Sequence, residues 1–240
     1  MNYKKVGMYA ILGILFFLPV TFLLFLYPAT HNYTPLDIVK ENVVDLNGFS
    51  TNSEEDIVLK DHITVLSFLG NTPMERLTAT SNLKELVYDK FKGFKKFQVV
   101  FVAPKGSEAA ARKMKKEISL YEDLRFLHVV FGSPDQIKSV FKSLKHVEPL
   151  NENLATDHVF IIDKDLNQRG RIDDRTDNEV EKDKAIYGLN SYDCIEVAMI
   201  KNKMSEDLRI LFTEYRQKRK GEFNSTTRRA DDLKAENEKD

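Results

Sequence analysis

Residues 98–103 read QVVFVA, an apolar run rich in β-branched side chains. Such a run is typical of a strand that is buried on both faces of a sheet. Ser107 follows as a candidate N-cap residue, with Glu108 beside the positive end of the predicted helix dipole. The next apolar residues, Ala110, Ala111, Met114 and Ile118, share one helix face. This stretch therefore predicts a buried strand followed by a helix packed on the sheet.

The same alternation continues on both sides of this unit. Upstream, residues 63–68 predict a buried strand, and residues 83–91 carry apolar side chains at helical spacing. Downstream, RFLHVVF at 125–131 predicts another strand. Residues 133–136, Ser-Pro-Asp-Gln, then have the features of a helix start, with Ser as N-cap, Pro at N1 and Gln at N3. Strands that alternate with helices predict a mainly parallel sheet covered by helices.

The flanking segments complete the predicted domain. Residues 43–61 are interpreted as a short hairpin with Asn47-Gly48 at its turn, and HVFIID at 158–163 as a strand followed by a turn. A last amphipathic helix covers residues 204–215. The order hairpin, βαβ, α, ββ, α is that of a thioredoxin-like domain, predicted here over residues 43–220. Periodicity alone does not separate it from other small α/β folds.

The N-terminal segment predicts a membrane anchor. Residues 6–27 carry no charge, and as a helix they would extend about 33 Å, enough for a hydrocarbon core of about 30 Å. A cleaved signal peptide is the alternative, but its apolar core would be shorter. Lys4 and Lys5 precede the run, so residues 1–5 are expected in the cytoplasm and the domain on the periplasmic or extracytoplasmic side. Residues 28–42 are expected to be a linker, and residues 221–240 a disordered tail.

Charge and cysteine content narrow the possible functions. Beyond Lys4 and Lys5, 34 basic residues face 37 acidic ones, a net charge of −3. This balance gives no electrostatic case for nucleic acid as a partner. Cys194 is the single cysteine, so the chain can form neither an intrachain disulfide nor a CxxC motif.

Three motifs, in this order, resemble the Sco/SenC family of membrane-tethered thioredoxin-fold proteins. They are VLSFLGNTP at 65–73, FGSPDQIKSVFKSL at 131–144 and TDHVFIIDKDLNQRGRI at 156–172. Together they extend over residues 43–172, and the last helix extends the match to about residue 218. The resemblance implies a role in copper insertion into cytochrome c oxidase.

The sequence departs from this family where the family binds copper. The family carries two copper-ligating cysteines in the turn after the first long strand, whereas residues 70–76 here read GNTPMER. By the resemblance, His158 corresponds to the third ligand. Copper(I) prefers thiolates, and His158 with the thioether of Met74 would be a poor replacement for a Cys2His site. A degenerate copper site without bound cofactor is therefore expected.

Other candidate residues have two interpretations each. His158 is either a remnant metal ligand or a strand residue held by a local hydrogen bond. Cys194 lies in the apolar context YDCIEVAMI, so an inert packing role is favoured over a reactive thiol. The acidic residues between Asp173 and Asp183 lack the glycine and closing glutamate of a calcium-binding EF-hand loop, so a solvated surface loop is expected.

Three functions remain open from the sequence. The favoured one is an accessory or assembly factor for a respiratory oxidase, which would bind a protein partner, an oxidase subunit or a Sco-like paralogue, and would not be an enzyme. The second is a thiol–disulfide or copper-binding protein that uses atypical residues. The third is a structural envelope protein.

Overall fold

The computed structural model describes residues 3–26, 34–51, 56–119 and 123–220. It divides into two units, one containing the N-terminal helix and the other extending from Pro35 to Phe223, and each is described by itself. The predicted tail at 221–240 and the first part of the predicted linker, 28–33, lie outside the described residues.

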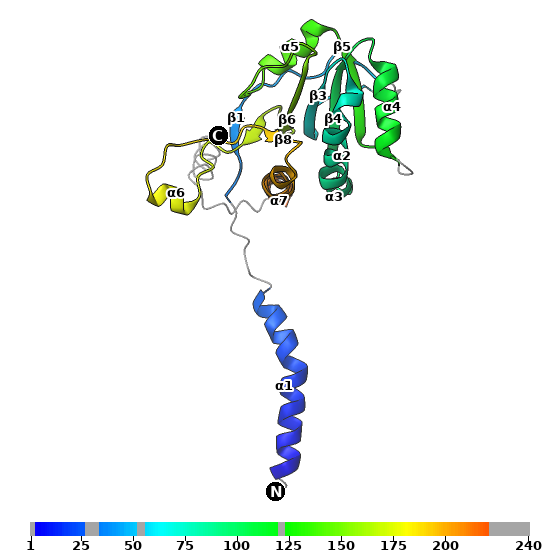
Figure 1. Ribbon diagram of the computed structural model, residues 1–240. Helices are drawn as coiled ribbons and strands as arrows, with labels where there is room; N and C mark the ends of the chain where they lie inside the picture. Colours follow the sequence, from blue (N-terminus) through cyan, green and yellow to red (C-terminus); the bar gives the residue numbers. More distant parts are fainter. Residues whose placement is uncertain (1–2, 27–33, 52–55, 120–122, 221–240) are drawn as a thin grey trace, which may run out of the picture. The chain divides into compact units, whose positions relative to one another are not determined.

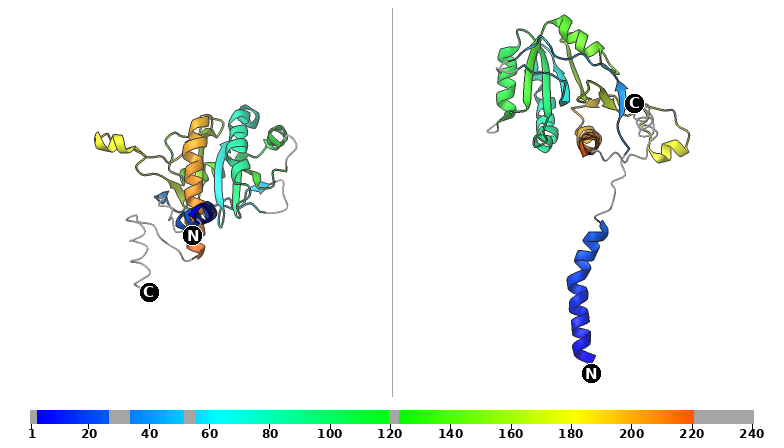
Figure 2. Two further views of the ribbon diagram at one scale, coloured as in Figure 1. Left: turned by 90° about the horizontal axis from the view of Figure 1, so that it is seen from below. Right: turned by 180° about the vertical axis from the view of Figure 1, so that it is seen from behind.

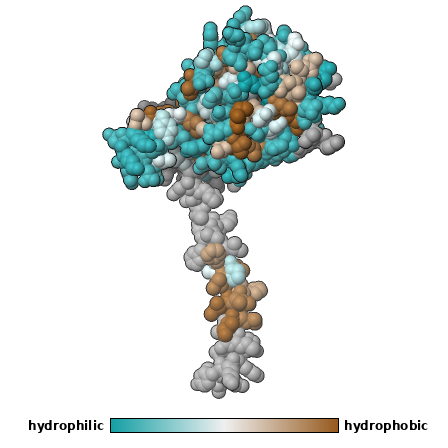
Figure 3. Space-filling model, in the orientation of Figure 1, coloured by the Kyte–Doolittle hydropathy of each residue, from teal (hydrophilic) through white to brown (hydrophobic). Residues whose placement is uncertain are grey.

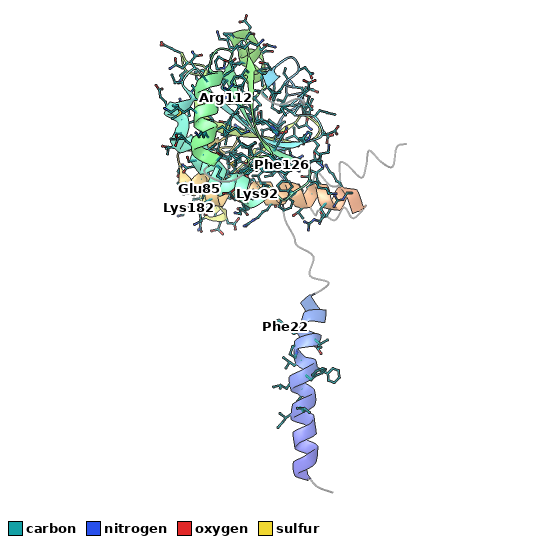
Figure 4. All side chains as sticks on the ribbon, turned by 90° about the vertical axis from the view of Figure 1, so that its right-hand side faces the viewer. Phe22, Glu85, Lys92, Arg112, Phe126 and Lys182 are labelled. Atoms are coloured by element: carbon teal, nitrogen blue, oxygen red, sulfur yellow. The ribbon has the colours of Figure 1, made fainter. Side chains whose placement is uncertain are left out.

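The N-terminal unit contains one long helix, α1 (Tyr3–Leu26), with Pro19 inside it. The side chains described in α1, residues 11–22, are almost all exposed, and they are mostly apolar (Figure 3). Phe22 is an example, on the surface of the helix and 61% exposed (Figure 4). Within the residues that the structure describes, no helix is both long and apolar enough to cross a membrane.

A mixed sheet organises the second unit (Figure 1). Its strands follow the order β1-β7-β6-β3-β4-β5-β2, and β8 also pairs with β6. β3, β4 and β5 are parallel, whereas β6 is antiparallel to β3 and to β7. The strands are β1 (Asp37–Lys40), β2 (Ser50–Thr51), β3 (Ile63–Leu69), β4 (Phe97–Pro104), β5 (Leu127–Gly132), β6 (Ala155–Ile162), β7 (Gln168–Gly170) and β8 (Tyr192–Asp193).

Helices cover both faces of this sheet. The helices of the second unit are η1 (Pro73–Arg76), α2 (Leu77–Leu83), the π-helical turn η2 (Lys84–Tyr88), α3 (Asp89–Phe91), α4 (Glu108–Ser119), α5 (Pro134–Lys142), α6 (Asp177–Glu181), the π-helical turn η3 (Met199–Met204) and α7 (Ser205–Lys220). The α2–α3 run and α7 lie side by side on one face, as the left view of Figure 2 shows, and Phe91 stacks on Phe212 at 5.6 Å. α4 packs on the same face, and α5 lies on the opposite one.

Two hydrophobic clusters, one on each face, hold these layers together. Side chains alternate between the faces of a strand, so β4 contributes Val99 and Phe101 to one cluster and Val100 and Val102 to the other. The first cluster includes α4 and α7, and the second includes α5. This burial on both faces explains why the central strands are continuous apolar runs.

The connections give the domain its class. β3 and β4 form a βαβ unit through the α2–α3 run, β6 and β7 form an antiparallel pair, and α7 follows on the face of the first cluster. The predicted α/β, thioredoxin-like fold is therefore confirmed. β5 and α5 are inserted between the βαβ unit and the pair β6–β7. The predicted start of α5 is confirmed by a capping box between Ser133 and Gln136.

Two local predictions are wrong. Residues 43–61 do not pair as a hairpin within the described part of this range. The turn at Asn47-Gly48 exists, but β2 after it pairs with β5, and β1 before it pairs with β7. β1 also lies inside the predicted linker, 28–42, because Leu36 is buried and the strand joins the sheet edge. Sequence periodicity does not predict pairings between strands that are distant in the sequence.

Candidate functional site

The turn at residues 70–76 follows the carboxyl end of β3, where the resemblance predicts a degenerate copper site. Gly70 has a φ of +70°, and a Cβ atom there would lie 2.3 Å from the backbone oxygen of Asn153. The neighbouring backbone N–H of Asn71 donates to the same oxygen at 2.9 Å. The turn is therefore held tightly against the start of β6, and only glycine fits at its first position.

An ion pair occupies the far side of this turn. The guanidinium of Arg76 contacts the carboxylate of Asp157, which lies on β6. The Arg76 side chain is 19% exposed and that of Asp157 is 42% exposed. Within the turn, the hydroxyl of Thr72 donates to the carboxylate of Glu75 at 2.9 Å. The turn therefore contains charged and hydrogen-bonded groups at the place where a thioredoxin-like redox protein would carry thiols.

Cys194 lies next to this ion pair, although it is 118 positions from Arg76 in the sequence. Its thiol donates to the backbone oxygen of Asp157 at 2.6 Å, and its backbone N–H donates to the same oxygen at 2.9 Å. Its own carbonyl accepts from the side-chain amide of Asn82 at 3.0 Å. The residue is 1% exposed, so the predicted packing role is confirmed.

The environment of Cys194 also disfavours the thiolate. Burial raises the pKa of its thiol to about 12, and the carboxylates of Asp157 and Asp193 add to this rise. The thiolate, and not the thiol, is the nucleophile and the metal ligand. A thiol that stays protonated at neutral pH is therefore a poor nucleophile and a poor metal ligand. The structure thus brings the single thiol to the site but holds it in its unreactive form.

His158 and Met74 do not complete a copper site around this thiol. His158 is half-buried on β6, opposite Asp193 of β8, and its Nδ1 lies 3.2 Å from the hydroxyl of Ser191. Met74 packs against the hydrophobic cluster that contains α7. Within the described residues, no three His, Cys, Asp or Glu side chains are grouped closely enough to hold a metal ion. A thioether used in packing and a protonated thiol do not fit copper(I).

The acidic connection at 173–183 lies mostly exposed on the surface, as predicted, and it is internally hydrogen-bonded. It contains α6, which begins with a capping box between Thr176 and Glu179. Glu179 accepts hydrogen bonds from Thr176, Tyr187 and Lys184, and the bond from the Thr176 backbone is the largest cause that lowers its pKa to about 2. Asp174 pairs with Lys203 at 2.8 Å. These carboxylates are used in internal contacts.

Sequence reasoning missed the cluster of Arg76, Asp157 and Cys194. The three residues belong to η1, β6 and the segment after β8, and they meet only because β6 lies between β3 and β7 and also pairs with β8. No spacing rule predicts such a meeting. The only signal in the sequence was the apolar context of Cys194, which indicated its burial.

Comparison with known proteins gives similarity in structure alone. No protein-family model matches the chain, and no curated protein matches it. The described fold is similar to a proposed protein disulfide isomerase from Bacteroides thetaiotaomicron, with a TM-score of 0.48 and 8% identity over 77% of this chain and 98% of that one.

Two further solved structures are similar in the same way. The thioredoxin domain of a thiol-disulfide oxidoreductase from Bacteroides vulgatus has a TM-score of 0.36 and 20% identity, over 62% of this chain and 100% of that one. Copper-bound ScoI from Bradyrhizobium japonicum has a TM-score of 0.38 and 14% identity, over 68% and 96%. Identities and TM-scores this low give no information on a substrate or a partner of this chain. The chain is thus similar to Sco and to thiol-disulfide oxidoreductases of the thioredoxin fold.

Proposed function

We propose that this chain is a membrane-anchored, Sco-like thioredoxin-fold protein that acts by binding another protein, without thiol or copper chemistry of its own. One observation carries this proposal. The turn after β3 contains no cysteine and is closed by the pair Arg76–Asp157, while the single thiol beside it is buried and hydrogen-bonded. A thiol–disulfide reaction needs two neighbouring sulfurs, and copper(I) needs soft, deprotonated ligands.

The anchor part of the proposal rests on the whole N-terminal sequence, because the structure describes the side chains of residues 11–22 alone within this helix. Residues 6–27 carry no charged side chain, and Lys4 and Lys5 precede them. Large apolar side chains such as Ile11 and Phe16 are 69% and 71% exposed on α1, which is costly in water and favourable in lipid. The positive-inside rule then favours a cytoplasmic N-terminus and a domain on the periplasmic or extracytoplasmic side.

The partner part of the proposal rests on the Sco-like motifs. They favour a role in the maturation of a respiratory oxidase, with an oxidase subunit or a Sco-like paralogue as partner. The turn at 70–76 offers a contact surface of mixed charge, since Arg76 and Asp157 are both partly exposed. A module of this kind could hold a partner near the membrane while another protein supplies the copper chemistry.

A complementation experiment tests the function. In cells that lack the gene, we expect lowered oxidase activity and lowered copper content of the oxidase. The doubly substituted chain Cys194→Ser/His158→Ala should restore both quantities as well as the unchanged chain does, because neither side chain is used chemically. An immunoblot of the membrane fraction controls for equal amounts of protein.

Other outcomes of this experiment would contradict separate parts of the proposal. Normal oxidase in the deletion strain would remove the oxidase role and favour a structural envelope protein. Failure of the double variant, at normal abundance, would favour thiol or copper chemistry through atypical residues. For the anchor, a C-terminal reporter enzyme that is active only outside the cytoplasm should be active, and an inactive reporter would reverse the proposed orientation.

A further inference from the structure

A cavity of about 720 Å³ lies at the amino end of β3, where Ile63 forms part of its wall. Five basic residues line it, three of them from the end of α7: Lys95, Lys164, Arg216, Lys218 and Arg219. Among the described residues that line the cavity, none is acidic. We call this cavity the basic pocket. Concentrated positive charge in a concave surface is a feature of anion-binding sites.

Aromatic rings form the rest of the pocket wall. Phe94 and Phe212 stack with their centroids 4.2 Å apart. Lys164 Nζ and Lys218 Nζ lie 5.1 Å and 5.2 Å from the ring centroid of Tyr215. The hydroxyl of Tyr215 in turn donates to the carboxylate of Asp165 at 3.2 Å. These contacts hold the ammonium groups of Lys164 and Lys218 near the ring of Tyr215, and the hydrogen bond to Asp165 fixes that ring.

Within the part of the chain that the structure describes, an ion pair is seen at one of these basic residues, Lys218. Glu214 pairs with Lys218 at 3.0 Å, but it also pairs with the buried Arg169 at 2.5 Å. Other basic residues come together from three elements, Lys90 from α3, Lys201 from η3 and Arg209 from α7. The pKa of Lys90 is lowered by partial burial and by the neighbouring charges of Arg209 and Lys201. Like charges gathered in this way favour an external anion that would bridge them.

We propose that the basic pocket binds phosphate oxyanions, and that the anionic headgroup of a membrane phospholipid is a ligand of this kind within its reach. Lys and Arg side chains around a cavity suit a phosphate group, which offers several acceptor oxygens. The lipid part of the inference rests on the proposed membrane anchor. The phosphate part rests on the pocket alone.

The length of the chain supports the lipid part. Eight residues separate Leu26, the last residue of α1, from Pro35, the first of the domain. Fully extended, eight residues reach at most about 28 Å. A domain tethered within this distance of a bilayer meets phospholipid headgroups at a high effective concentration.

The test compares two triple variants of the full chain in neutral maltoside micelles. The pocket variant is Lys95→Gln/Lys164→Gln/Arg216→Gln. The control variant, Arg112→Gln/Lys113→Gln/Lys116→Gln, removes the same number of Lys and Arg charges from exposed positions of α4. Thermal unfolding of both variants checks that they fold. One arm titrates inorganic phosphate calorimetrically. The other measures binding to vesicles of phosphatidylglycerol and phosphatidylcholine, with pure phosphatidylcholine vesicles as reference.

We expect the preference for phosphatidylglycerol vesicles over pure phosphatidylcholine vesicles to fall in the pocket variant by on the order of a hundred-fold, since each basic residue near an anionic surface contributes roughly five-fold. The control variant should change it much less. Loss of phosphate binding by the pocket variant alone would support the basic pocket as a phosphate-binding site. If the two variants then bind vesicles equally, the ligand is a free phosphate compound. Equal behaviour of the two variants in both arms would overturn the proposal. Failure of α1 to insert into a bilayer would overturn the anchor but not the phosphate arm.

Discussion

The two ends of β3 have opposite characters, although only about 20 Å of strand separates them. At the carboxyl end, the turn at 70–76 is packed against β6, its ion pair is partly exposed, and the thiol beside it is buried. At the amino end lies the basic pocket, an open cavity lined by five basic residues. At the neighbouring strands, Lys96 and Arg125 line a second cavity of about 310 Å³, but Asp56 lines it as well.

A chain can therefore keep a thioredoxin-like fold without keeping the redox site of that fold. The thioredoxin-like sheet is intact, yet the turn after β3 contains no pair of sulfurs. The basic pocket, for which we propose a ligand, lies at the other end of β3. Function in this chain must therefore be argued from the residues at each end, because fold similarity alone does not identify the chemistry at either one.

The largest expected effect concerns the buried ion pairs that fix α7 beside the basic pocket. The guanidinium of Arg169, 4% exposed, pairs with Asp163 at 3.0 Å and with Glu214 at 2.5 Å. Arg169→Met removes the cation that pairs with the buried Asp163 and leaves the buried Glu214 with Lys218, so it should lower the free energy of unfolding by about 3–5 kcal/mol. Chemical denaturation measures this change. Arg112→Met, at an exposed position of α4, is the control and should change it little. A loss near zero for Arg169→Met would show that α7 is held by apolar packing alone.

The next effect tests how tightly the carboxyl end is closed. Gly70→Ala introduces a Cβ atom at a position with φ of +70° and within 2.3 Å of a backbone oxygen. The free energy of unfolding should fall by about 2–4 kcal/mol, from backbone strain and steric overlap together. Gly106→Ala is a matched control, because its φ is +97° but its new Cβ would meet no atom within 4 Å. Equal losses in the two variants would mean that the turn at 70–76 can move away from β6.

A smaller effect depends on pH and belongs to the amino end. His128 lies on β5, and burial lowers its pKa to about 4, with Lys115 and His62 adding to the effect. The unfolded chain binds the proton near pH 6.5 and the folded chain only near pH 4, so stability rises with pH between these values. Lowering the pH from 8 to 5 should cost about 1–2 kcal/mol through this group. His128→Gln should remove this part of the pH dependence, and an unchanged pH profile would contradict it.

The smallest effect concerns the pair Arg76–Asp157. Because Asp157 is 42% exposed, water screens the pair, and Arg76→Ala should cost only about 0.2–1 kcal/mol. A double-mutant cycle with Asp157→Ala isolates the interaction from the other contacts of each residue. A coupling above about 2 kcal/mol would show that the pair is an important structural lock of the carboxyl end. It would also make the turn less suitable as a contact surface.

Much of the fold could be predicted from the sequence, because its signals are local. The buried strands were visible as apolar runs, and α5 was visible from Ser133 and Gln136. β1 and β2 were not, since a four-residue and a two-residue strand are defined by distant partners in β7 and β5. Ser107 lies at the start of α4 as predicted, but its hydroxyl donates to the carbonyl of Pro104 at 2.6 Å.

The two ends of β3 were less predictable. The missing cysteines at 70–76 could be read directly, but the meeting of Arg76, Asp157 and Cys194 needed the order of the strands. The net charge did not indicate the basic pocket, because it sums the pocket's five basic residues with the acidic residues at 173–183. Local concentrations of charge arise from folding, and composition does not report them.

Whether the carboxyl end of β3 binds metal is decided by copper(I) titration of the full chain under reducing conditions, against a competing chromophoric chelator. We expect no stoichiometric binding tighter than about 1 µM, since the thiol of Cys194 stays protonated and the half-buried Met74 packs against the hydrophobic cluster. One equivalent bound more tightly than this, and lost on His158→Ala or Cys194→Ser, would contradict the claim that the carboxyl end of β3 has no metal or thiol chemistry.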